Sequence, residues 1–201
     1  MKHWEFTGEE KVQFGVTLKR IRATIDFVLK CGIKISKGEE GGWIEKEENL
    51  SGDAWVFDNA RVSGNALVYG NARVYGDARV SGNARVYGNA RVYGDAWVSG
   101  NAWVSGNALV YGNARVYGNA HYMTVGPAGS RNDITTFTRD AKGTIYVVCG
   151  CFYGTIDEFR KKVKERHAGT KHETVYLTAA SLAELQIDTT PFEETEKEAK
   201  E

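Results

Sequence analysis

Two cysteines and two histidines near the C-terminus have a spacing that could bind a metal. Cys149 and Cys151 precede His167 and His172 in the pattern C-x-C-x15-H-x4-H. Thiolate sulfur and imidazole nitrogen are the ligands of structural zinc sites, although C-x-C is tighter than their usual spacing. Residues two apart in a strand share a face, so both thiols can point the same way. The pattern predicts either a zinc site or a cysteine pair packed beside a histidine that ends a helix.

A glycine-rich stretch, "VGPAGSRND", lies upstream of the cysteines at residues 125–133. A loop of small residues can direct backbone N–H groups at an anion, and an arginine can bind the same anion through two parallel hydrogen bonds. The stretch lacks the full phosphate-loop motif, so a plain turn remains the alternative. If the loop binds a ligand, we expect a small anionic one held by four residues: Gly126, Gly129, Ser130 and Arg131.

A third chemical candidate is His121, because hexapeptide-repeat acyltransferases use a histidine as general base. No carboxylate or acceptor-site signature accompanies His121, and residues 53–120 contain no inserted loop. We therefore predict no catalytic residue and expect His121 to be a solvated surface side chain. An acyltransferase-like enzyme stays the first alternative function.

These candidates must be positioned by a repeat of six residues, G-[N/D]-A-x-V-[Y/S]. Valine recurs every sixth position from Val56 to Val116, and an alanine stands two residues before each valine. Residues two apart point to one side of a strand, whereas Gly followed by Asn or Asp turns the chain. A fixed short period of this kind predicts a parallel β-helix with Val and Ala inside.

A second period sets the cross-section. Ser63, Ser81 and Ser99 recur at 18-residue intervals, and so do Tyr75, Tyr93 and Tyr111. Eighteen residues are three hexapeptides, so the repeat predicts a three-sided coil. About four coils at roughly 4.8 Å per layer make a prism about 20 Å tall.

The sequence divides into four parts around this repeat. We expect a small β-rich N-terminal cap at 1–49, the β-helix at 50–122, an α+β cap at 123–187 and a disordered acidic tail at 188–201. In the C-terminal cap, two strands flank an Asp-Ala-Lys-Gly turn. Thr155 with Glu158 forms a capping box that starts one helix, and a second helix runs from about Glu173 to Leu185.

The outward rows of the repeat carry Arg, Tyr and Trp, which are enriched in interface hot spots. Two exposed Trp residues on a small prism need a cover, so the rows predict self-association, most simply as a trimer. Alternatively, the aromatic side chains only stack along the sheet and stabilise it. The residues predicted for the interface are Trp97, Trp103, Tyr75, Tyr93 and Tyr111.

The composition excludes some classes of protein. Lys and Arg total 26, and so do Asp and Glu, which disfavours nucleic-acid binding. Outward Arg ladders keep nucleic-acid binding as the second alternative. The repeat contains six Arg and four Asp, and this surplus of positive charge is small for binding a row of phosphates. No apolar run reaches the roughly 20 residues of a membrane span. Three cysteines make no disulfide framework, so we expect a cytoplasmic protein, with no cofactor other than the candidate zinc.

Five segments together resemble a family of hexapeptide-type β-solenoid proteins, left-handed β-helix-like in fold and found in bacteriophages, prophages and gut bacteria. They are "EFTGE", "LKRIRA", "GGWIEKEENLS", "GDAWVFDNARVSGNA" and "CGCFYGTIDEF". The resemblance implies the fold and a mobile-element origin, with the host cytoplasm as location, and it supplies no activity. We therefore expect a non-enzymatic binding or scaffold protein. By analogy, it would serve counter-defence by binding a host protein or sequestering a nucleotide-like ligand.

Overall fold

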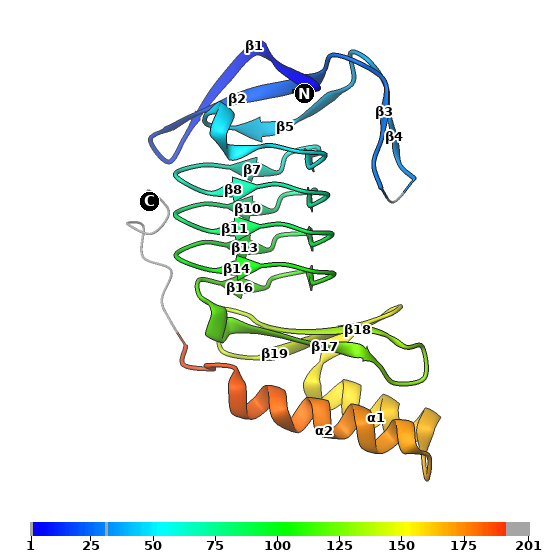
Figure 1. Ribbon diagram of the computed structural model, residues 1–201. Coiled ribbons are helices and arrows are strands. Elements are labelled where there is room, and N and C mark those ends of the chain that lie inside the picture. The colour runs from blue at the N-terminus through cyan, green and yellow to red at the C-terminus, as the bar shows by residue number, and fades with distance from the viewer. Residues whose placement is uncertain (1, 31, 192–201) are drawn as a thin grey trace.

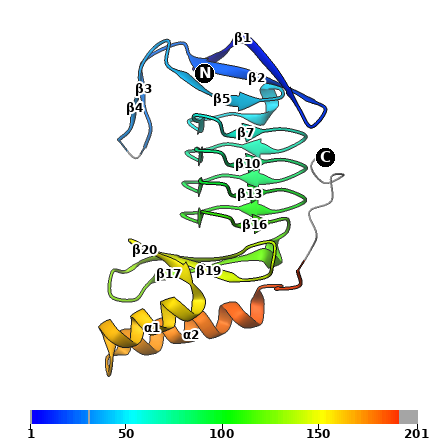
Figure 2. The ribbon, with the colours of Figure 1, turned by 180° about the vertical axis from the view of Figure 1, so that it is seen from behind.

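The computed structural model describes residues 2–30 and 32–191. A column of stacked coils stands between a β-rich N-terminal cap and a C-terminal cap in which two helices lie on the outer side of a sheet (Figure 1). Figure 2 shows the same column from behind. In the described part of the chain, no helix is both long and apolar enough to cross a membrane.

Each hexapeptide forms a two-residue strand followed by a corner. Arg79 pairs in parallel with Arg61 on one side and with Trp97 on the other, 18 residues away in each direction. The predicted three-sided coil is thereby confirmed. We name its three faces by what lies against them. The hairpin face comprises β7 (Arg61–Val62), β10 (Arg79–Val80), β13 (Trp97–Val98) and β16 (Arg115–Val116). The open face comprises β8 (Leu67–Val68), β11 (Arg85–Val86) and β14 (Trp103–Val104). The arm face comprises β6 (Trp55–Val56), β9 (Arg73–Val74), β12 (Arg91–Val92) and β15 (Leu109–Val110).

The interior of the column is filled by the alanine and valine rows. All eleven valines from Val56 to Val116 are at most 1% exposed, and so are the alanines from Ala54 to Ala114. Burying a valine contributes about 1.5–3 kcal/mol, so the repeat stabilises itself coil by coil. The inward assignment of the Val and Ala rows is confirmed.

Side chains of the corners also stack on their equivalents in the next coil. The rings of Tyr75 and Tyr93 lie 4.8 Å apart and nearly parallel, and those of Tyr69 and Tyr87 lie 5.0 Å apart. At another corner, the amide of Asn89 donates to Asn107. The ladders repeat the coil spacing because equivalent residues sit directly above one another.

The N-terminal cap closes the upper end of the column. β1 (Trp4–Gln13) and β2 (Val16–Ala23) form an antiparallel hairpin, and β5 (Glu40–Ile44) joins β2 to β7. The antiparallel hairpin therefore ends the parallel ladder, as a solenoid end requires. A second hairpin, β3 (Phe27–Val28) and β4 (Lys34–Ile35), forms an arm that hangs beside the coils (Figures 1 and 2).

The C-terminal cap closes the lower end with an antiparallel sheet, β17 (Tyr122–Ala128), β18 (Asp133–Arg139), β19 (Ile145–Cys149) and β20 (Phe152–Thr155). Side chains of this end accept the last coil's backbone donors: Asn119 Oδ1 accepts from Trp103 N–H at 2.8 Å, and Thr136 Oγ1 from Leu109 N–H at 3.0 Å. The outer face of the sheet is covered by α1 (Ile156–His167) and α2 (Lys171–Gln186). The capping box of Thr155 and Glu158 is confirmed.

Residue 188, the predicted start of the disordered tail, is held in place by the rest of the chain. Ile187 is 4% exposed, and Asp188, the first residue of that segment, donates its N–H to Ala120 O at 2.8 Å. The prediction was wrong for this position because a buried side chain and a backbone hydrogen bond anchor the chain there. Residues 192–201 of the predicted tail lie outside the described residues.

Candidate functional site

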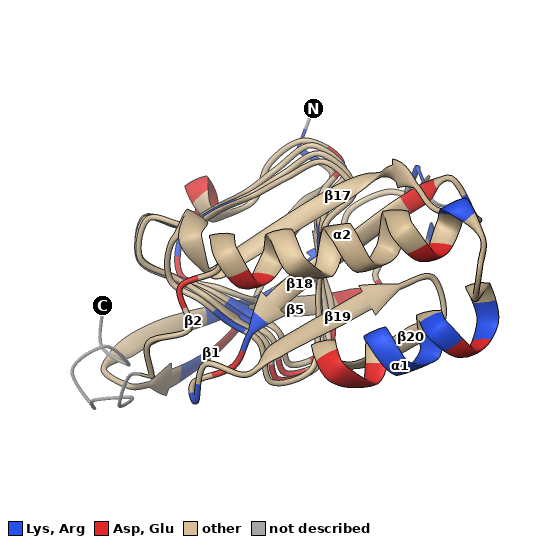
Figure 3. Cartoon of the chain, turned by 90° about the horizontal axis from the view of Figure 1, so that it is seen from below, with Lys and Arg blue, Asp and Glu red and all other residues tan. Residues whose placement is uncertain are grey.

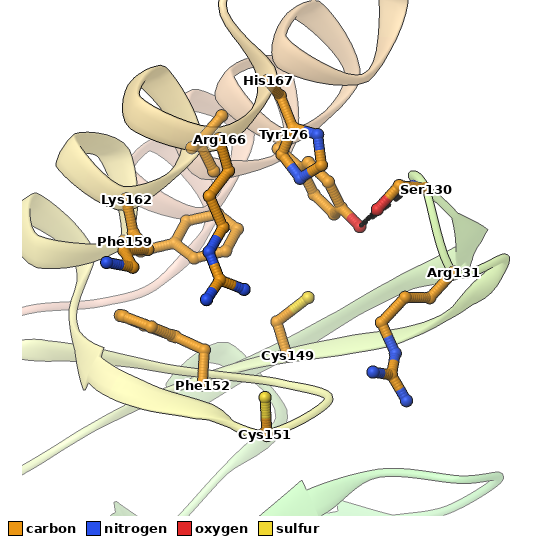
Figure 4. Close-up of a pocket in the computed structure, with 11 residues that line it drawn as sticks. Ser130, Arg131, Cys149, Cys151, Phe152, Phe159, Lys162, Arg166, His167 and Tyr176 are labelled. Atoms are coloured by element: carbon orange, nitrogen blue, oxygen red, sulfur yellow. Dashed lines mark hydrogen bonds between the residues drawn. The ribbon is translucent and has the colours of Figure 1, made fainter.

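A cavity of about 260 Å³ opens in the C-terminal cap, between the helices and the ends of the sheet strands (Figure 4). It brings together residues from three predicted features: the glycine-rich loop, the cysteine pair and the histidine that ends α1. The lining residues are Ser130, Arg131, Cys149, Cys151, Phe152, Phe159, Lys162, Val163, Arg166, His167 and Tyr176.

Helix α1 supplies the floor and one cationic wall. Phe159 and Val163, four residues apart, are buried against the sheet. Lys162 and Arg166 have the same spacing and lie beside that apolar stripe, so their charged ends reach the rim of the cavity. Figure 3 shows the basic residues along α1 as seen from below. The amphipathic pattern of the helix thus places cations next to an apolar floor.

The glycine-rich loop is held against the cavity by a tyrosine of α2. The hydroxyl of Tyr176 accepts the backbone N–H of Ser130 at 3.1 Å and lies 3.3 Å from Ser130 Oγ. Gly129 has φ +72°, and a Cβ there would lie 2.1 Å from Tyr176 Cζ, so this position requires glycine. The Ser130 N–H therefore positions the loop instead of facing a ligand. Gly126 sits at the β17–β18 irregularity opposite Asp133, and neither glycine lines the cavity.

Arg131 crosses the turn between β19 and β20. A Cβ built on Gly150 would lie only 3.0 Å from Arg131 Nε, which shows how closely the guanidinium passes over the turn. In Figure 4, the guanidinium of Arg131 extends from the loop toward the coils of the solenoid. Of the predicted anion-binding residues, Ser130 and Arg131 reach the cavity.

The structure does not assemble the predicted zinc site. Cys149, Cys151 and His167 line the cavity, but His172 is not among the lining residues, and its ring centre lies 6.1 Å from that of His167. Instead, Cys149 Sγ accepts a hydrogen bond from Thr135 Oγ1, and the His167 ring packs 5.4 Å from the Tyr176 ring. Within residues 2–30 and 32–191, no three Cys, His, Asp or Glu side chains form a group that could hold a metal ion. The described residues therefore do not show the predicted ligand set gathered at one point, and zinc binding stays a prediction.

The cavity is electropositive. Arg131, Lys162 and Arg166 contribute three cations, and none of the described residues that line it is acidic. Lys162 makes an exposed ion pair with Glu165 at 3.1 Å, which is worth little because water screens it. Within the described part of the chain, Arg131 and Arg166 have no carboxylate partner. The geometry suits an anion that also carries an apolar or aromatic group.

His121 occupies a different place, at the junction between the last coil and the C-terminal cap. Its Nδ1 accepts the Tyr117 N–H at 3.1 Å. Burial, assisted by the charge of Arg139, lowers the pKa of His121 below its ordinary value. The prediction of a solvated surface histidine is wrong, because the ring is half-buried and hydrogen-bonded.

The residues predicted for a subunit interface lie in two kinds of place. Trp97 is 5% exposed, and the ring of Tyr117 packs against it. The Nε1–H of Trp97 donates to Ser81 Oγ. Trp97 also lines a hollow together with Phe14 of the β1–β2 turn. The expected exposure of Trp97 is therefore wrong, because this chain covers the ring itself. Trp103, on the open face, is 46% exposed. The remaining three, Tyr75, Tyr93 and Tyr111, stack on one another, and Tyr153 of the C-terminal cap packs against the last of them.

Six residues of the cavity were not among the predicted site residues: Phe152, Phe159, Lys162, Val163, Arg166 and Tyr176. The pairing of Lys162 and Arg166 beside the Phe159 stripe was readable from the helix period. The contact between Tyr176 and Ser130 was not, because it joins residues 46 apart in the sequence.

The fold defines this chain as a β-solenoid repeat protein. The family model described as YdcK Beta solenoid repeat matches residues 54–70, 60–76, 66–82, 72–86, 78–94, 84–100, 102–118 and 108–121. The repeats are therefore similar to those of the YdcK β-solenoid, and the matches leave both caps outside. No curated protein is found to match the chain.

Proposed function

We propose that this protein is a binding protein whose cavity in the C-terminal cap takes a small anionic ligand. The observation that carries the proposal is that Arg131 and Arg166, both without a carboxylate partner among the described residues, line one cavity that has an apolar floor. A volume of about 260 Å³ is slightly below the roughly 300–1,000 Å³ of typical ligand sites. A phosphorylated group with one aromatic ring, such as a mononucleotide, matches this combination of size, charge and floor.

The aromatic part of the ligand has defined neighbours. Phe152 and Phe159 lie with ring centres 5.5 Å apart, and Tyr176 is 5.8 Å from Phe159. Rings at these distances form a wall against which a further flat group can pack. In a counter-defence role, the protein would bind a nucleotide-like signal in this cavity and so sequester it.

Calorimetric titration with AMP tests the proposal. Wild-type protein should bind AMP, and Arg166→Gln should weaken the affinity about 10- to 100-fold, because a charge-assisted hydrogen bond is worth about 1.5–3 kcal/mol. Lys164→Gln is the matched control: it removes one charge from the same helix at an exposed position that does not line the cavity. Absence of AMP binding at millimolar concentration, or equal effects of the two variants, would contradict the proposal.

A second part of the proposal concerns assembly. Trp103 is the interface candidate whose ring is substantially exposed, and the guanidinium carbon of Arg85 lies 4.9 Å from its ring centre. We propose that copies of the protein associate through this open face. Exposed aromatic surface of this kind is characteristic of interaction sites. Sedimentation of wild-type protein against Trp103→Ser tests this association.

A further inference from the structure

Two more hollows lie on the arm face of the solenoid, above the cavity in the C-terminal cap. One, of about 500 Å³, extends from Arg73 to Arg131, and the other, of about 270 Å³, lies beside the arm at Lys30. The two hollows share Arg73 and Asn89, whereas the larger hollow shares Arg131 with the cavity. The three therefore form one continuous surface, which we call the basic track.

Both ends of the track are walled by the caps. At the upper end, the ring of Phe27 in the arm packs 5.4 Å from the outward ring of Trp55. At the lower end, β18 contacts Leu109 through the hydrogen bond to Thr136. The arm and the loop between β17 and β18 project on the same side of the column (Figures 1 and 2). Between these walls, the outward side chains are Arg73 and Arg91.

The charge along the track is mainly positive. Its cations are Lys30, Arg73, Arg91 and Arg131, and its one acidic residue among those described is Asp133, whose Oδ1 already accepts the N–H of Ile134. Beside the arginines runs a column of side-chain amides: Asn71, Asn89 and Asn107. The neutral total charge of the chain therefore conceals a cationic groove, and it is the local distribution that attracts an anion.

We propose that the basic track binds a short single-stranded nucleic acid, with one nucleotide seated in the cavity of the C-terminal cap. This inference rests on the proposed function of that cavity. Arginine forks bind phosphates in succession, amide side chains donate to and accept from bases, and aromatic rings stack on bases.

An acidic peptide fits the same surface less well. Extended peptides are held mainly by main-chain hydrogen bonds to a free sheet edge. Strand β9 is paired with both β6 and β12, and β12 is paired with both β9 and β15, so the strands beneath the track offer no such edge. The side chains of the track suit phosphates and bases better than a peptide backbone.

Fluorescence anisotropy with labelled mixed-sequence octanucleotides, one RNA and one DNA, tests the inference. Arg91→Gln should weaken octamer binding at least fivefold and reduce the slope of log affinity against log salt by about 0.7, the contribution of one phosphate contact in a single strand. Arg85→Gln is the matched control, because it changes the same position of the preceding hexapeptide, which lies on the open face. The control should leave octamer affinity and salt slope unchanged, and Arg91→Gln should leave AMP binding unchanged.

The outcomes separate the two proposals. If AMP binds and requires Arg166, but the octamers bind no more tightly than AMP, the track proposal is overturned and the cavity proposal stands. If the octamers require Arg91 and AMP does not bind, the track is supported and the small-ligand function is overturned. Equal loss in Arg91→Gln and Arg85→Gln, or tighter binding of a labelled octa-glutamate peptide than of either oligonucleotide, contradicts the nucleic-acid inference.

Discussion

In the solenoid, a side chain's main neighbour is the residue 18 positions away, whereas in the C-terminal cap it comes from an unrelated segment. Tyr75 stacks on Tyr93, and Asn89 donates to Asn107. In the cap, Ser130 is held by Tyr176. Repetition makes every coil support the next, but it gives each coil the same surface. A site that differs from its surroundings has to be built where the repetition stops or where a cap meets it.

The two caps differ from each other in the same way. The N-terminal cap extends one sheet of the solenoid through β5 and β2, so its hydrogen bonds continue the ladder. The C-terminal cap instead lays a separate sheet under the last coil and contacts that coil through side chains such as Asn119 and Thr136. The separate sheet and its own helices enclose the cavity between them.

The largest expected effect is a change inside the solenoid. Val86→Asp puts a carboxylate at a fully buried position, which should cost more than about 4 kcal/mol and unfold the coils. Arg85→Asp is the control, since the neighbouring side chain is exposed and its removal costs about 0.5–1 kcal/mol of cation–π interaction. Thermal melting by circular dichroism measures both. A Val86→Asp protein that melts near the wild-type temperature would refute the inward assignment.

The next comparison is between two tryptophans of the same repeat position. Trp97→Ser should destabilise the protein by about 3 kcal/mol, because the ring is 5% exposed and donates to Ser81. Trp103→Ser should cost less than about 1 kcal/mol and convert any oligomer to monomer. Urea unfolding gives the stabilities, and sedimentation gives the assembly. A wild-type protein that stays monomeric at high concentration removes the self-association proposal.

A third effect is confined to the C-terminal cap. Gly129→Ala should weaken AMP binding at least tenfold, because its Cβ cannot coexist with Tyr176 in the present position. Gly169→Ala has the same φ of +72° and open space around its Cβ, so it isolates the backbone cost of about 1–2 kcal/mol. Calorimetric titration and thermal melting of both variants measure these effects. Unchanged AMP affinity in Gly129→Ala would show that the loop does not shape the site.

The smallest effect is a pH dependence at the junction of solenoid and cap. The pKa of His121 is lowered by burial and by Arg139, so folding favours the neutral ring. Its contribution is present above the unfolded value of about 6.5 and is lost as the pH falls through the lower folded pKa. Asp188, whose pKa is also lowered, titrates below this window.

Urea unfolding at pH 7.5 and pH 5.5 checks the His121 effect. Wild-type stability should decrease at the lower pH, and His121→Asn should show a smaller decrease, because Asn does not titrate but can still accept the Tyr117 N–H. Equal decreases in both proteins would assign the pH dependence to other groups.

The sequence determined the solenoid almost completely. The inward rows, the corners and the three-sided coil follow from periods of six and 18 residues, since each strand pairs with a copy of itself. The first helix of the cap was also predictable, because the capping box of Thr155 and Glu158 is a local interaction. Local and periodic features can be predicted from the sequence, because the residues that determine them are close in sequence or repeat at a fixed interval.

The tertiary structure alone decided the cavity and the basic track. The sequence pointed to Ser130, Arg131 and the cysteine pair, but it could not show that α1 places Arg166 beside them. It predicted an exposed Trp97 because no pattern indicates that the β1–β2 hairpin reaches down over a solenoid face. The neutral net charge disfavoured nucleic-acid binding, whereas the fold gathers basic residues from the arm, the coils and the cap. These contacts join segments with no shared period, so only the packing of the caps on the column specifies them.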